Sequence, residues 1–323
     1  MARYLVTGVA GFVGSTLAEA LLTEGHHVLG MDAITDYYPP AHKREHLNRL
    51  SPEDRFDFIE ADLLSDDLRE RLRGVDVVFH LAGQPGVRAS WGVSFRDYAE
   101  RNILATQRLL EAARDTPLSR FVYASSSSIY GDAPELPTRE TTLPQPVSPY
   151  GVTKLAAEHL CGIYGRAFGV PTVSLRYFTV YGPRQRPDMA FRRWIDAGLH
   201  GEALHVNGDG RQARDFTYVE DIVAGTIAAA TSDGLAPGAV FNLGGGVRTT
   251  VNEVLDILAA IFGHPLEVER MPGQDGDARE TYSDCSKARA QLGYEPTWTL
   301  DAGLRAQFEW QSQEPALAAR NSG

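Results

Sequence analysis

The sequence is poor in cysteine and in long apolar runs. Only two cysteines, Cys161 and Cys285, occur in 323 residues, too few for the disulfide framework of a secreted protein. No apolar stretch approaches the roughly 18 residues that a membrane-spanning helix needs. The N-terminal segment has one charge and a short apolar run, which does not fit a secretory signal. These absences predict a cytoplasmic protein with no membrane partner.

Basic residues are in the minority and are not clustered. Lys and Arg number 31 against 42 Asp and Glu, a formal net charge of −11. Binding to nucleic acid or to an anionic membrane surface needs a basic patch, so neither partner is expected. A small molecule or another protein remains. Only Lys43, Lys154 and Lys287 are lysines, so a lysine inside a motif is informative.

Short apolar runs alternate with amphipathic stretches through the first half of the chain. This alternation is typical of the strands and crossover helices of a parallel sheet. The expected strands are 4–7, 27–31, 56–60, 75–81, 120–124 and 172–177, with a possible return to the sheet at 239–243. Helical spacing between them is followed by Val13, Leu17, Ala20 and Leu21, and by Ile103, Leu109, Leu110 and Ala113. We therefore predict a doubly wound α/β fold.

The rhythm of strands and helices breaks after Tyr177 into turn-rich sequence. At this length about two domains are expected. We predict a larger domain over 1–177 that the chain re-enters near 213–246. A smaller, discontinuous substrate domain is expected over 178–212 and 247–314. The segment 315–323 is expected to be a disordered tail.

Three glycines, Gly8, Gly11 and Gly14, follow the first predicted strand, with Phe12 and Val13 between the last two. At a junction of strand and helix, such glycines let the backbone approach a pyrophosphate at the helix N-terminus. The spacing G-x-x-G-x-x-G differs from G-x-G-x-x-G, and a glycine-rich turn can mimic it. We expect a dinucleotide-binding site here.

A carboxylate, Asp32, ends the second predicted strand 18 residues after Gly14. At this position a carboxylate can accept hydrogen bonds from both ribose hydroxyls and would repel a 2′-phosphate, which favours NAD over NADP. The alternative is a turn residue that caps the next segment. Asp62, beside Leu63 after the third strand, is a further candidate for the adenine edge, with a helix N-cap as the alternative.

Tyr150 and Lys154 form a Tyr-x-x-x-Lys pair, which places both side chains on one face of a helix. With 13 tyrosines and few lysines, the pair is rare by chance, and it follows a strand that runs into four serines. A nearby ammonium group and an oxidised nicotinamide would lower the phenol pKa and make Tyr150 a usable base. An ordinary surface pair on a helix is the alternative.

With these motifs in this order, the sequence resembles the extended short-chain dehydrogenase/reductase family, which includes nucleotide-sugar epimerases and dehydratases. The resemblance covers nearly the whole chain. It rests on 7–14, Asp32, Asp62, 80–83, Asn102, Ser126, Tyr150, Lys154, 176–178 and 214–218.

The resemblance implies a Rossmann-type fold, NAD as cofactor and a role for each motif residue. Ser126 would bind the sugar O4, Tyr150 would be the base, and Lys154 would bind the ribose and tune the pKa of Tyr150. The residues implied along the nicotinamide half are Leu81, Ala82, Gly83 and Tyr177.

The two positions after Ser126 bear on the reaction. In the 4,6-dehydratases of this family they carry Asp and Glu, the acid and base of the elimination, and the decarboxylases have Glu at the second position. Here they are Ser127 and Ser128, which cannot take those roles. The resemblance therefore implies simple 4-epimerisation: hydride removal from C4, rotation of a 4-keto intermediate and hydride return.

Several local segments resemble UDP-glucuronate 4-epimerases more than UDP-galactose 4-epimerases. Ser127, Ser128 and Thr179 offer neutral donors, and Arg186 offers a charge, to a C6 carboxylate that Asp-Glu would repel. Pairing of Arg186 with Asp188 at a loop surface is the alternative. The segments are 36–38 with 43–44, 84–88, 178–183 and 186–189.

The diphosphate contacts are less well defined by the resemblance. Departures from the family at 84–86 and 274–277 affect this region. The further cationic candidates for the UDP-sugar are Arg88, Arg211, Arg214 and Arg279, and a solvated surface arginine is the alternative for each.

Two other functions stay open. A UDP-glucose/UDP-galactose 4-epimerase is the nearest, because it shares the whole catalytic set. A non-catalytic NAD-sensing regulator on the same fold is the other, but such proteins usually lose the Tyr or the Lys, and both are present here.

The family resemblance also implies a homodimer through the helices near 95–113 and 150–168. Leu155, His159 and Ile163 form a stripe that could face the partner. Packing on the chain's own sheet is the alternative for each of them.

Overall fold

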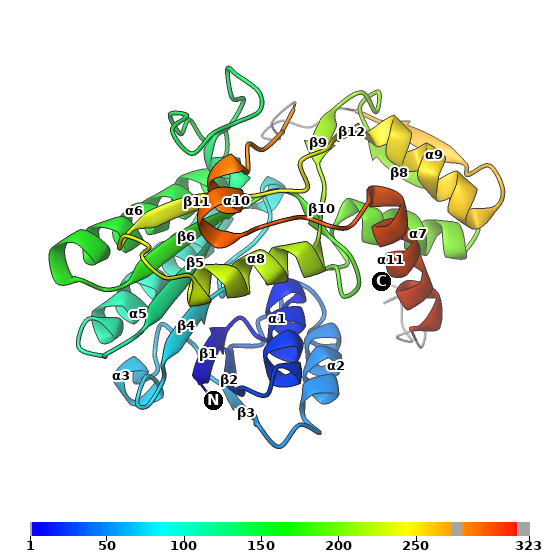
Figure 1. Cartoon of the computed structure of the whole chain (residues 1–323). Helices are drawn as coiled ribbons and strands as arrows, with labels where there is room; N and C mark the ends of the chain where they lie inside the picture. Colours follow the sequence, from blue (N-terminus) through cyan, green and yellow to red (C-terminus); the bar gives the residue numbers. More distant parts are fainter. Residues whose placement is uncertain (1, 273–279, 315–323) are drawn as a thin grey trace.

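The computed structural model describes residues 2–272 and 280–314, and its centre is a seven-stranded parallel sheet (Figure 1). The strand order is β3-β2-β1-β4-β5-β6-β11. The strands are β1 (Arg3–Thr7), β2 (His27–Asp32), β3 (Phe56–Glu60), β4 (Val77–His80), β5 (Arg120–Ser126), β6 (Thr172–Tyr177) and β11 (Ala239–Leu243). The predicted doubly wound α/β fold is confirmed. β4 is shorter than expected because the chain joins the sheet only at Val77, and β5 runs two residues further, to Ser126.

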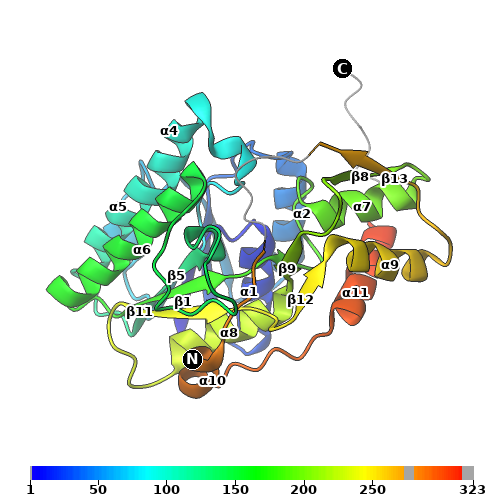
Figure 2. The same ribbon diagram turned by 90° about the horizontal axis from the view of Figure 1, so that it is seen from above.

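Helices cover both faces of this sheet, so its central strands are buried on both sides (Figures 1 and 2). One face carries α3 (Leu68–Arg71), α5 (Ala105–Ala113) and α6 (Pro149–Phe168), which share a buried cluster with β1, β4 and β5. The other face carries α1 (Phe12–Thr23), α2 (Pro40–Leu50), α8 (Val219–Thr231) and α10 (Ser286–Leu292).

Short helical turns connect these layers near the ends of the strands. Between β4 and α5 the chain forms the 3₁₀ turns η1 (Arg88–Ser90) and η2 (Gly92–Ser94), then α4 (Phe95–Tyr98) and the π-helical turn η3 (Ala99–Leu104). A further 3₁₀ turn, η4 (Ser127–Ile129), follows β5 directly.

A second apolar cluster lies beside the sheet, away from α5 and α6 (Figure 2). It is built by α7 (Ala190–Leu199), β8 (Leu204–Asn207), α9 (Val251–Phe262), β13 (Val268–Met271) and α11 (Leu300–Gln313). The remaining short strands are β7 (Val180–Tyr181), which pairs with β10 (Thr217–Tyr218), and β9 (Ala213–Asp215), which pairs with β12 (Arg248–Thr250). Phe12 of α1 belongs to this cluster as well, so α1 contacts both this cluster and the core on its own face of the sheet.

The strand order reverses between β1 and β4, and this topology locates a binding site. In open α/β sheets, ligands bind outside the carboxyl ends of the strands at such a switch point. The glycine loop follows β1, and residues 81–83 follow β4. The fold therefore brings two predicted cofactor-binding segments to one crevice.

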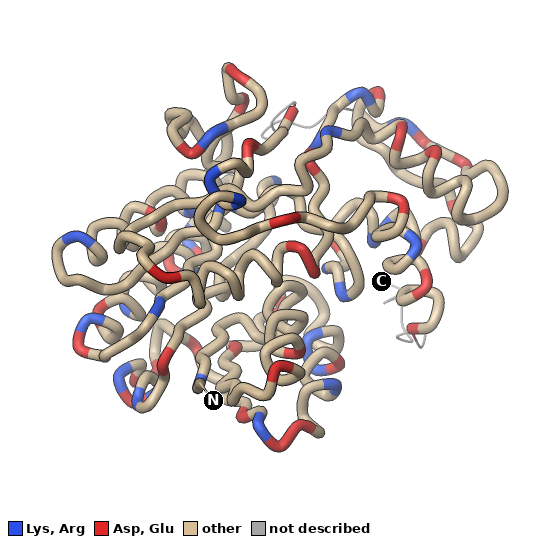
Figure 3. Tube along the Cα trace, in the orientation of Figure 1, with Lys and Arg blue, Asp and Glu red and all other residues tan. Residues whose placement is uncertain are grey.

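Charges of both signs are interspersed along the trace (Figure 3). Over residues 2–272 and 280–314, none of the helices has the length and apolar character needed to cross a membrane. Arg279, residues 274–277 and the expected tail 315–323 lie outside the described residues.

Candidate active site

The glycine loop is shaped by contacts that leave no room for side chains. Gly8 has φ +72°, and a Cβ there would lie 2.8 Å from Ala82 N. Gly14 lies in the first turn of α1, where a Cβ would lie 2.2 Å from the Gly8 carbonyl oxygen. Gly11 is the N-cap of α1 and provides no side-chain cap, so the positive end of the helix is available to an anionic ligand.

Asp32 lies beside this loop at the end of β2. Its carboxylate accepts hydrogen bonds from the backbone N–H of Ala10 at 3.1 Å and of Ile34 at 2.8 Å. Burial raises the pKa of Asp32, while the nearby Lys43 and the two amides act to lower it. Asp32 thus caps the following turn, as the alternative required, and also lines the cleft where a ribose is expected.

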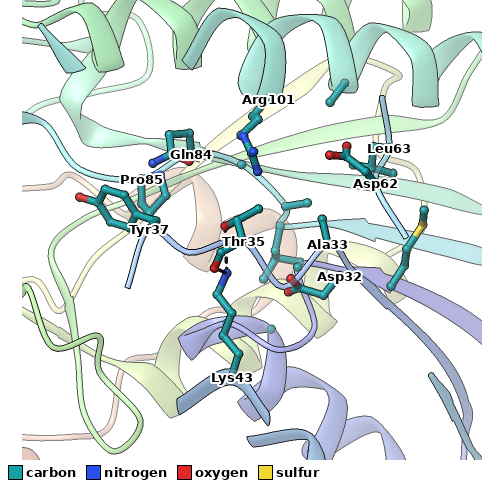
Figure 4. A pocket seen from close by; sticks show the side chains of 18 of the residues that line it. Asp32, Ala33, Thr35, Tyr37, Lys43, Asp62, Leu63, Gln84, Pro85 and Arg101 are labelled. Atoms are coloured by element: carbon teal, nitrogen blue, oxygen red, sulfur yellow. Dashed lines mark hydrogen bonds between the residues drawn. The ribbon is translucent and has the colours of Figure 1, made fainter. Parts of the chain in front are cut away.

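These residues border one open cleft (Figure 4). The predicted residues that line it are Gly8, Gly11, Phe12, Val13, Gly14, Asp32, Asp62, Leu63, Leu81, Ala82, Gly83 and Arg186. Asp62 Oδ1 accepts from Leu64 N at 2.9 Å, whereas the next helix, α3, is capped by Asp67. The helix N-cap alternative for Asp62 is therefore wrong.

The helix α6 carries Tyr150 and Lys154 and begins immediately before them. Ser148 is its N-cap and accepts from Gly151 N, and Pro149 occupies the first helical position, where its missing N–H costs nothing. Gly169 ends the helix in the left-handed conformation, at φ 72°. The start of the helix thus fixes Tyr150 in its first turn.

Tyr150 and Ser126 meet across the end of β5. The phenol of Tyr150 and the hydroxyl of Ser126 form a hydrogen bond, and Ser126 also accepts from Ser128 N at 3.1 Å. Burial raises the pKa of Tyr150, whereas the bond from Ser126 and the charge of Arg186 act to lower it. The Lys154 ammonium lies 4.6 Å from the centroid of the Tyr123 ring, and the predicted effect of Lys154 on the pKa of Tyr150 stays a prediction.

Lys154 is 7% exposed and lies close to residue 83, where a Cβ would be 4.0 Å from its Nζ. Asn102 joins this loop to the helix: its side chain accepts from Gln84 N at 2.6 Å and donates to Thr153 Oγ1 at 3.0 Å. Asn102 lies in the π-helical turn η3, a feature often found at functional sites. Asn102 thus fixes the position of the helix that carries Tyr150 and Lys154 relative to the cleft wall.

The candidate sugar residues lie next to this pair. Ser127 and Ser128 open η4 directly after Ser126. Arg186 lines the cleft and also forms a two-point ion pair with Asp188, with Nε and Nη2 each 2.9 Å from a carboxylate oxygen. The predicted alternative, a pair with Asp188, is therefore present, and contact of Arg186 with a sugar carboxylate stays a prediction. Thr179 stands between β6 and β7, where its carbonyl accepts from Thr217 N.

Other candidates lie further from the cleft lining. The Arg88 guanidinium lies 2.8 and 3.0 Å from the side-chain amide of Asn207, which can accept both bonds when its oxygen faces Arg88, and this contact links the loop after β4 to β8. Arg211 lies at an exposed turn, paired with Asp209. Arg214 donates to the Ala213 carbonyl at 2.9 Å. The Tyr177 hydroxyl bonds to Thr226 Oγ1 at 2.8 Å, and Tyr177 packs against the core beneath the sheet edge.

Eleven of the residues that line the cleft were not among the predicted site residues, including Tyr37, Lys43, Gln84, Pro85 and Arg101 (Figure 4). Lys43 and Arg101 point into the cleft from opposite sides, and Lys43 donates to the Thr35 carbonyl at 2.8 Å. The rarity of lysine was a usable signal for Lys43. Arg101 had no such signal among the many arginines.

Comparison with known proteins agrees with this geometry. Residues 4–244 match the NAD dependent epimerase/dehydratase family. The chain is 46% identical over 311 residues to the uncharacterized UDP-glucose epimerase YtcB of Bacillus subtilis (strain 168), covering 96% of this chain and 98% of that protein. It is 37% identical over 322 residues to the UDP-glucuronate 4-epimerase of Thermodesulfobacterium geofontis (strain OPF15), covering 98% of both.

A solved structure extends the similarity to three dimensions. The UDP-glucuronic acid 4-epimerase from Bacillus cereus, in complex with UDP-glucuronic acid and NAD, has a TM-score of 0.94 and 44% sequence identity. The match covers 96% of this chain and 99% of that one.

Proposed function

This chain belongs to the NAD-dependent epimerase/dehydratase family, and we propose that it is a UDP-glucuronate 4-epimerase. The observation that carries the proposal is the match, at TM-score 0.94 and 44% identity, to an epimerase that holds UDP-glucuronic acid and NAD. We assign the chemistry that this reaction needs to the cleft residues together with Ser126, Tyr150 and Lys154, which are not among the residues that line the cleft.

The cofactor is NAD, and the cleft residues fit it. The close contacts at Gly8 and Gly14 leave backbone, rather than side chains, facing a pyrophosphate. Asp32 presents a carboxylate to a ribose, where a 2′-phosphate would be repelled. When bound, NAD accepts a hydride from C4 of the sugar and returns it to the opposite face, so it is not consumed.

Tyr150 takes the proton of the sugar 4-hydroxyl and gives it back after the sugar has turned. Ser126, hydrogen-bonded to the Tyr150 phenol, is placed to hold the same sugar oxygen. Lys154, whose ammonium group lies beside residue 83, is placed to bind the nicotinamide ribose. General acid–base catalysis by one group then serves both halves of the reaction.

A carboxylate at C6 is accommodated by Ser127, Ser128 and Thr179 as neutral donors and by Arg186 as the cation. Asp188 holds the Arg186 guanidinium at the cleft wall through two hydrogen bonds. With serine at positions 127 and 128, the site has no carboxylate there to eliminate water from C5 and C6.

Turnover of UDP-glucuronate and UDP-glucose, measured side by side, tests the sugar. We expect the wild type to prefer UDP-glucuronate, and Arg186→Ala or Thr179→Ala to impair that sugar more than UDP-glucose. An ionic hydrogen bond contributes about 1.5 to 3 kcal/mol against about 1 for a neutral one. Arg305→Ala, which removes an exposed arginine paired with Asp301, is the control.

A wild type that prefers UDP-glucose would overturn the uronate assignment and favour the neutral-sugar epimerase named for the B. subtilis relative. NADH that accumulates with one sugar nucleotide would indicate a dehydrogenase. A chain that binds NAD but turns over no UDP-sugar would favour the third alternative, a non-catalytic NAD-sensing regulator.

The proposed assembly is a homodimer through α4, α5 and α6. Phe95, Leu104, Val152, Ile163 and Phe168 are between 40% and 48% exposed along these helices and the intervening turn η3. His159 is exposed beside Ile163, but Leu155 packs on Ile129, Tyr130 and Phe178 of the same chain. The proposed interface therefore uses only part of the predicted stripe.

Light scattering tests the dimer, which should have twice the chain mass of 35.4 kDa. We expect Ile163→Asp to give the monomer mass, whereas Leu143→Asp, on a loop at 70% exposure, should leave the dimer intact. A wild type at the monomer mass would exclude this assembly. The division into a cofactor domain and a substrate domain, and the cytoplasmic location, stay predictions.

A further inference from the structure

A buried carboxylate joins the catalytic helix to two neighbouring strands. Glu158 on α6 is 5% exposed and accepts from Arg176 of β6, Nη2 to Oε1 at 2.6 Å and Nε to Oε2 at 3.0 Å. Its Oε2 also accepts from Ser125 Oγ of β5 at 2.6 Å. Burial of a charged pair is costly unless its hydrogen bonds are satisfied, and here both partners are fully engaged.

Each member of this trio is close in sequence to a proposed site residue. Glu158 follows Lys154 by four residues and so lies on the same helix face. Ser125 precedes Ser126, and strand alternation turns the two side chains to opposite sides of the sheet. A shift of the Glu158 carboxylate would therefore change the distance between Ser126 and the helix that carries Tyr150.

The network continues into the segment that leads to α6. Arg176 Nη1 donates to the Tyr130 hydroxyl at 2.6 Å and to the Glu140 carbonyl at 3.1 Å. Tyr130 in turn donates to Asn242 Oδ1 at 2.7 Å, at the sheet edge. The chain between η4 and the N-cap of α6 is thus anchored to the same buried arginine.

The charge of Glu158 also bears on Lys154. Burial lowers the pKa of Lys154 to about 8, and Glu158 and Cys161 oppose this shift. Burial raises the pKa of Cys161 well above its ordinary value, so its thiol is neutral at pH 7. The other groups that face Lys154 are His80 of β4 and Tyr123 of β5, and Arg176 faces Glu158 from β6.

We propose that Glu158 is a positioning residue for the epimerase reaction, which fixes the strand end of Ser126 against the helix of Tyr150 and places its negative charge on the helix face that carries Lys154. The inference rests on the proposed 4-epimerase function. It assigns Glu158 no contact with the substrate, and it predicts two separable effects, one geometric and one electrostatic.

Three variants separate these effects. Glu158→Gln keeps the size of the side chain and removes its charge. Glu158→Asp keeps the charge on a shorter side chain, so the carboxylate lies further from its partners. Ser125→Ala removes only the hydrogen bond to β5. Glu314→Gln is the control, because Glu314 forms an equally buried pair with Arg192 between α7 and the end of α11. Each is measured for kcat, for KM with UDP-glucuronate, for the pH profile of kcat and for thermal stability.

We expect Glu158→Gln to lower kcat by about 10- to 100-fold with little change in KM, as misplaced groups do. The alkaline limb of its pH profile should move to lower pH by about half a unit or more, because Lys154 loses a favourable charge. In Glu158→Asp the alkaline limb of the pH profile should lie at the same pH as in the wild type, whereas kcat should stay low. Ser125→Ala should lower kcat and leave the limb in place.

A folded Glu158→Gln with the wild-type kcat and pH limb would overturn the inference, as would an equal shift of the limb in Glu314→Gln. If Glu158→Gln does not fold, wild-type kcat in both Ser125→Ala and Glu158→Asp would overturn it. A wild type that epimerises no UDP-sugar would instead refute the proposed function, before any variant is compared.

Discussion

At the scale of single residues, the chemistry of Tyr150 depends on a small number of close neighbours. Burial alone would keep its phenol protonated, and the hydrogen bond from Ser126 and the charge of Arg186 act against that. The Tyr98 ring packs edge-on at 6.3 Å between centroids and limits the phenol's movement. A positive nicotinamide beside it would lower the pKa further, so activity should rise as the phenol loses its proton.

Removing the Tyr150 hydroxyl tests this role. Tyr150→Phe should lower kcat by about 10²- to 10⁴-fold, the usual loss of a general base, while NAD stays bound. Tyr164→Phe removes a phenol from the same helix, where it donates to Glu111, and should leave kcat unchanged. Initial rates with UDP-glucuronate and NAD titration check both variants. A Tyr150→Phe rate near that of the wild type would assign the base elsewhere.

Single residues were predictable from the sequence where their partners are local. The Tyr150–Lys154 pair and the glycine loop could be predicted from residue spacing within one helix or one turn. Asp32 could be predicted from its position at the end of one strand. Arg186, Lys43 and Arg101 reach the cleft from loops and helices far apart in the chain. Their placement depends on how those segments pack, which a local pattern does not encode.

At the scale of elements, the first βα unit shows how a glycine allows a helix to begin close to a strand. Gly14 faces the Gly8 carbonyl at a distance that excludes a Cβ. The strands of the sheet were predicted nearly to the residue because buried parallel strands are short apolar runs. The π-helical turn at Ala99–Leu104 was not predicted, and Asn102 within it bonds to Gln84 N, a residue 18 positions away in the sequence.

Gly14→Ala should therefore displace the N-terminus of α1 and weaken NAD binding by at least tenfold, together with a loss of stability. A Cβ 2.2 Å from a backbone oxygen forces the backbone to move. Gly162→Ala, in the interior of α6, meets only the flexible end of Arg166 at 3.2 Å and should be neutral or stabilising. Calorimetric NAD titration and thermal unfolding compare them. Equal NAD affinity in the two variants would contradict this account of the loop.

At the scale of the whole molecule, buried histidines connect the cofactor loop to its surroundings. His80 bridges Thr7 at 2.8 Å and Thr106 at 2.9 Å. The Thr106 hydroxyl donates to the Asn102 carbonyl, so His80 Nε2 must carry the proton and donate to Thr106. His46 of α2 donates from Nδ1 to the Ala10 carbonyl. Both bonding patterns are satisfied by neutral imidazole.

Because both histidines are neutral in the folded protein, its stability depends on pH. Burial lowers the pKa of His46 to about 4 and that of His80 to about 3. Below the unfolded pKa of about 6.5 the unfolded chain binds these protons and the folded chain does not, so stability falls with decreasing pH until the folded values are reached. Asp32 and Asp215, whose pKa values burial raises, act in the opposite sense.

Comparison of variants separates the histidine contribution from that of the carboxylates. As the pH falls from 7 to 5, each histidine should lower the free energy of unfolding by about 2 kcal/mol. Most of this loss occurs below pH 6.5, where the histidine of the unfolded chain is protonated. In urea unfolding without added NAD, His46→Gln should show a smaller loss between these two pH values than the wild type. His27→Gln, at an exposed position, should show the wild-type loss. An unchanged pH dependence in His46→Gln would mean that His46 takes up its proton at the same pH in the folded and the unfolded protein, so that its bond to the Ala10 carbonyl does not require the neutral ring.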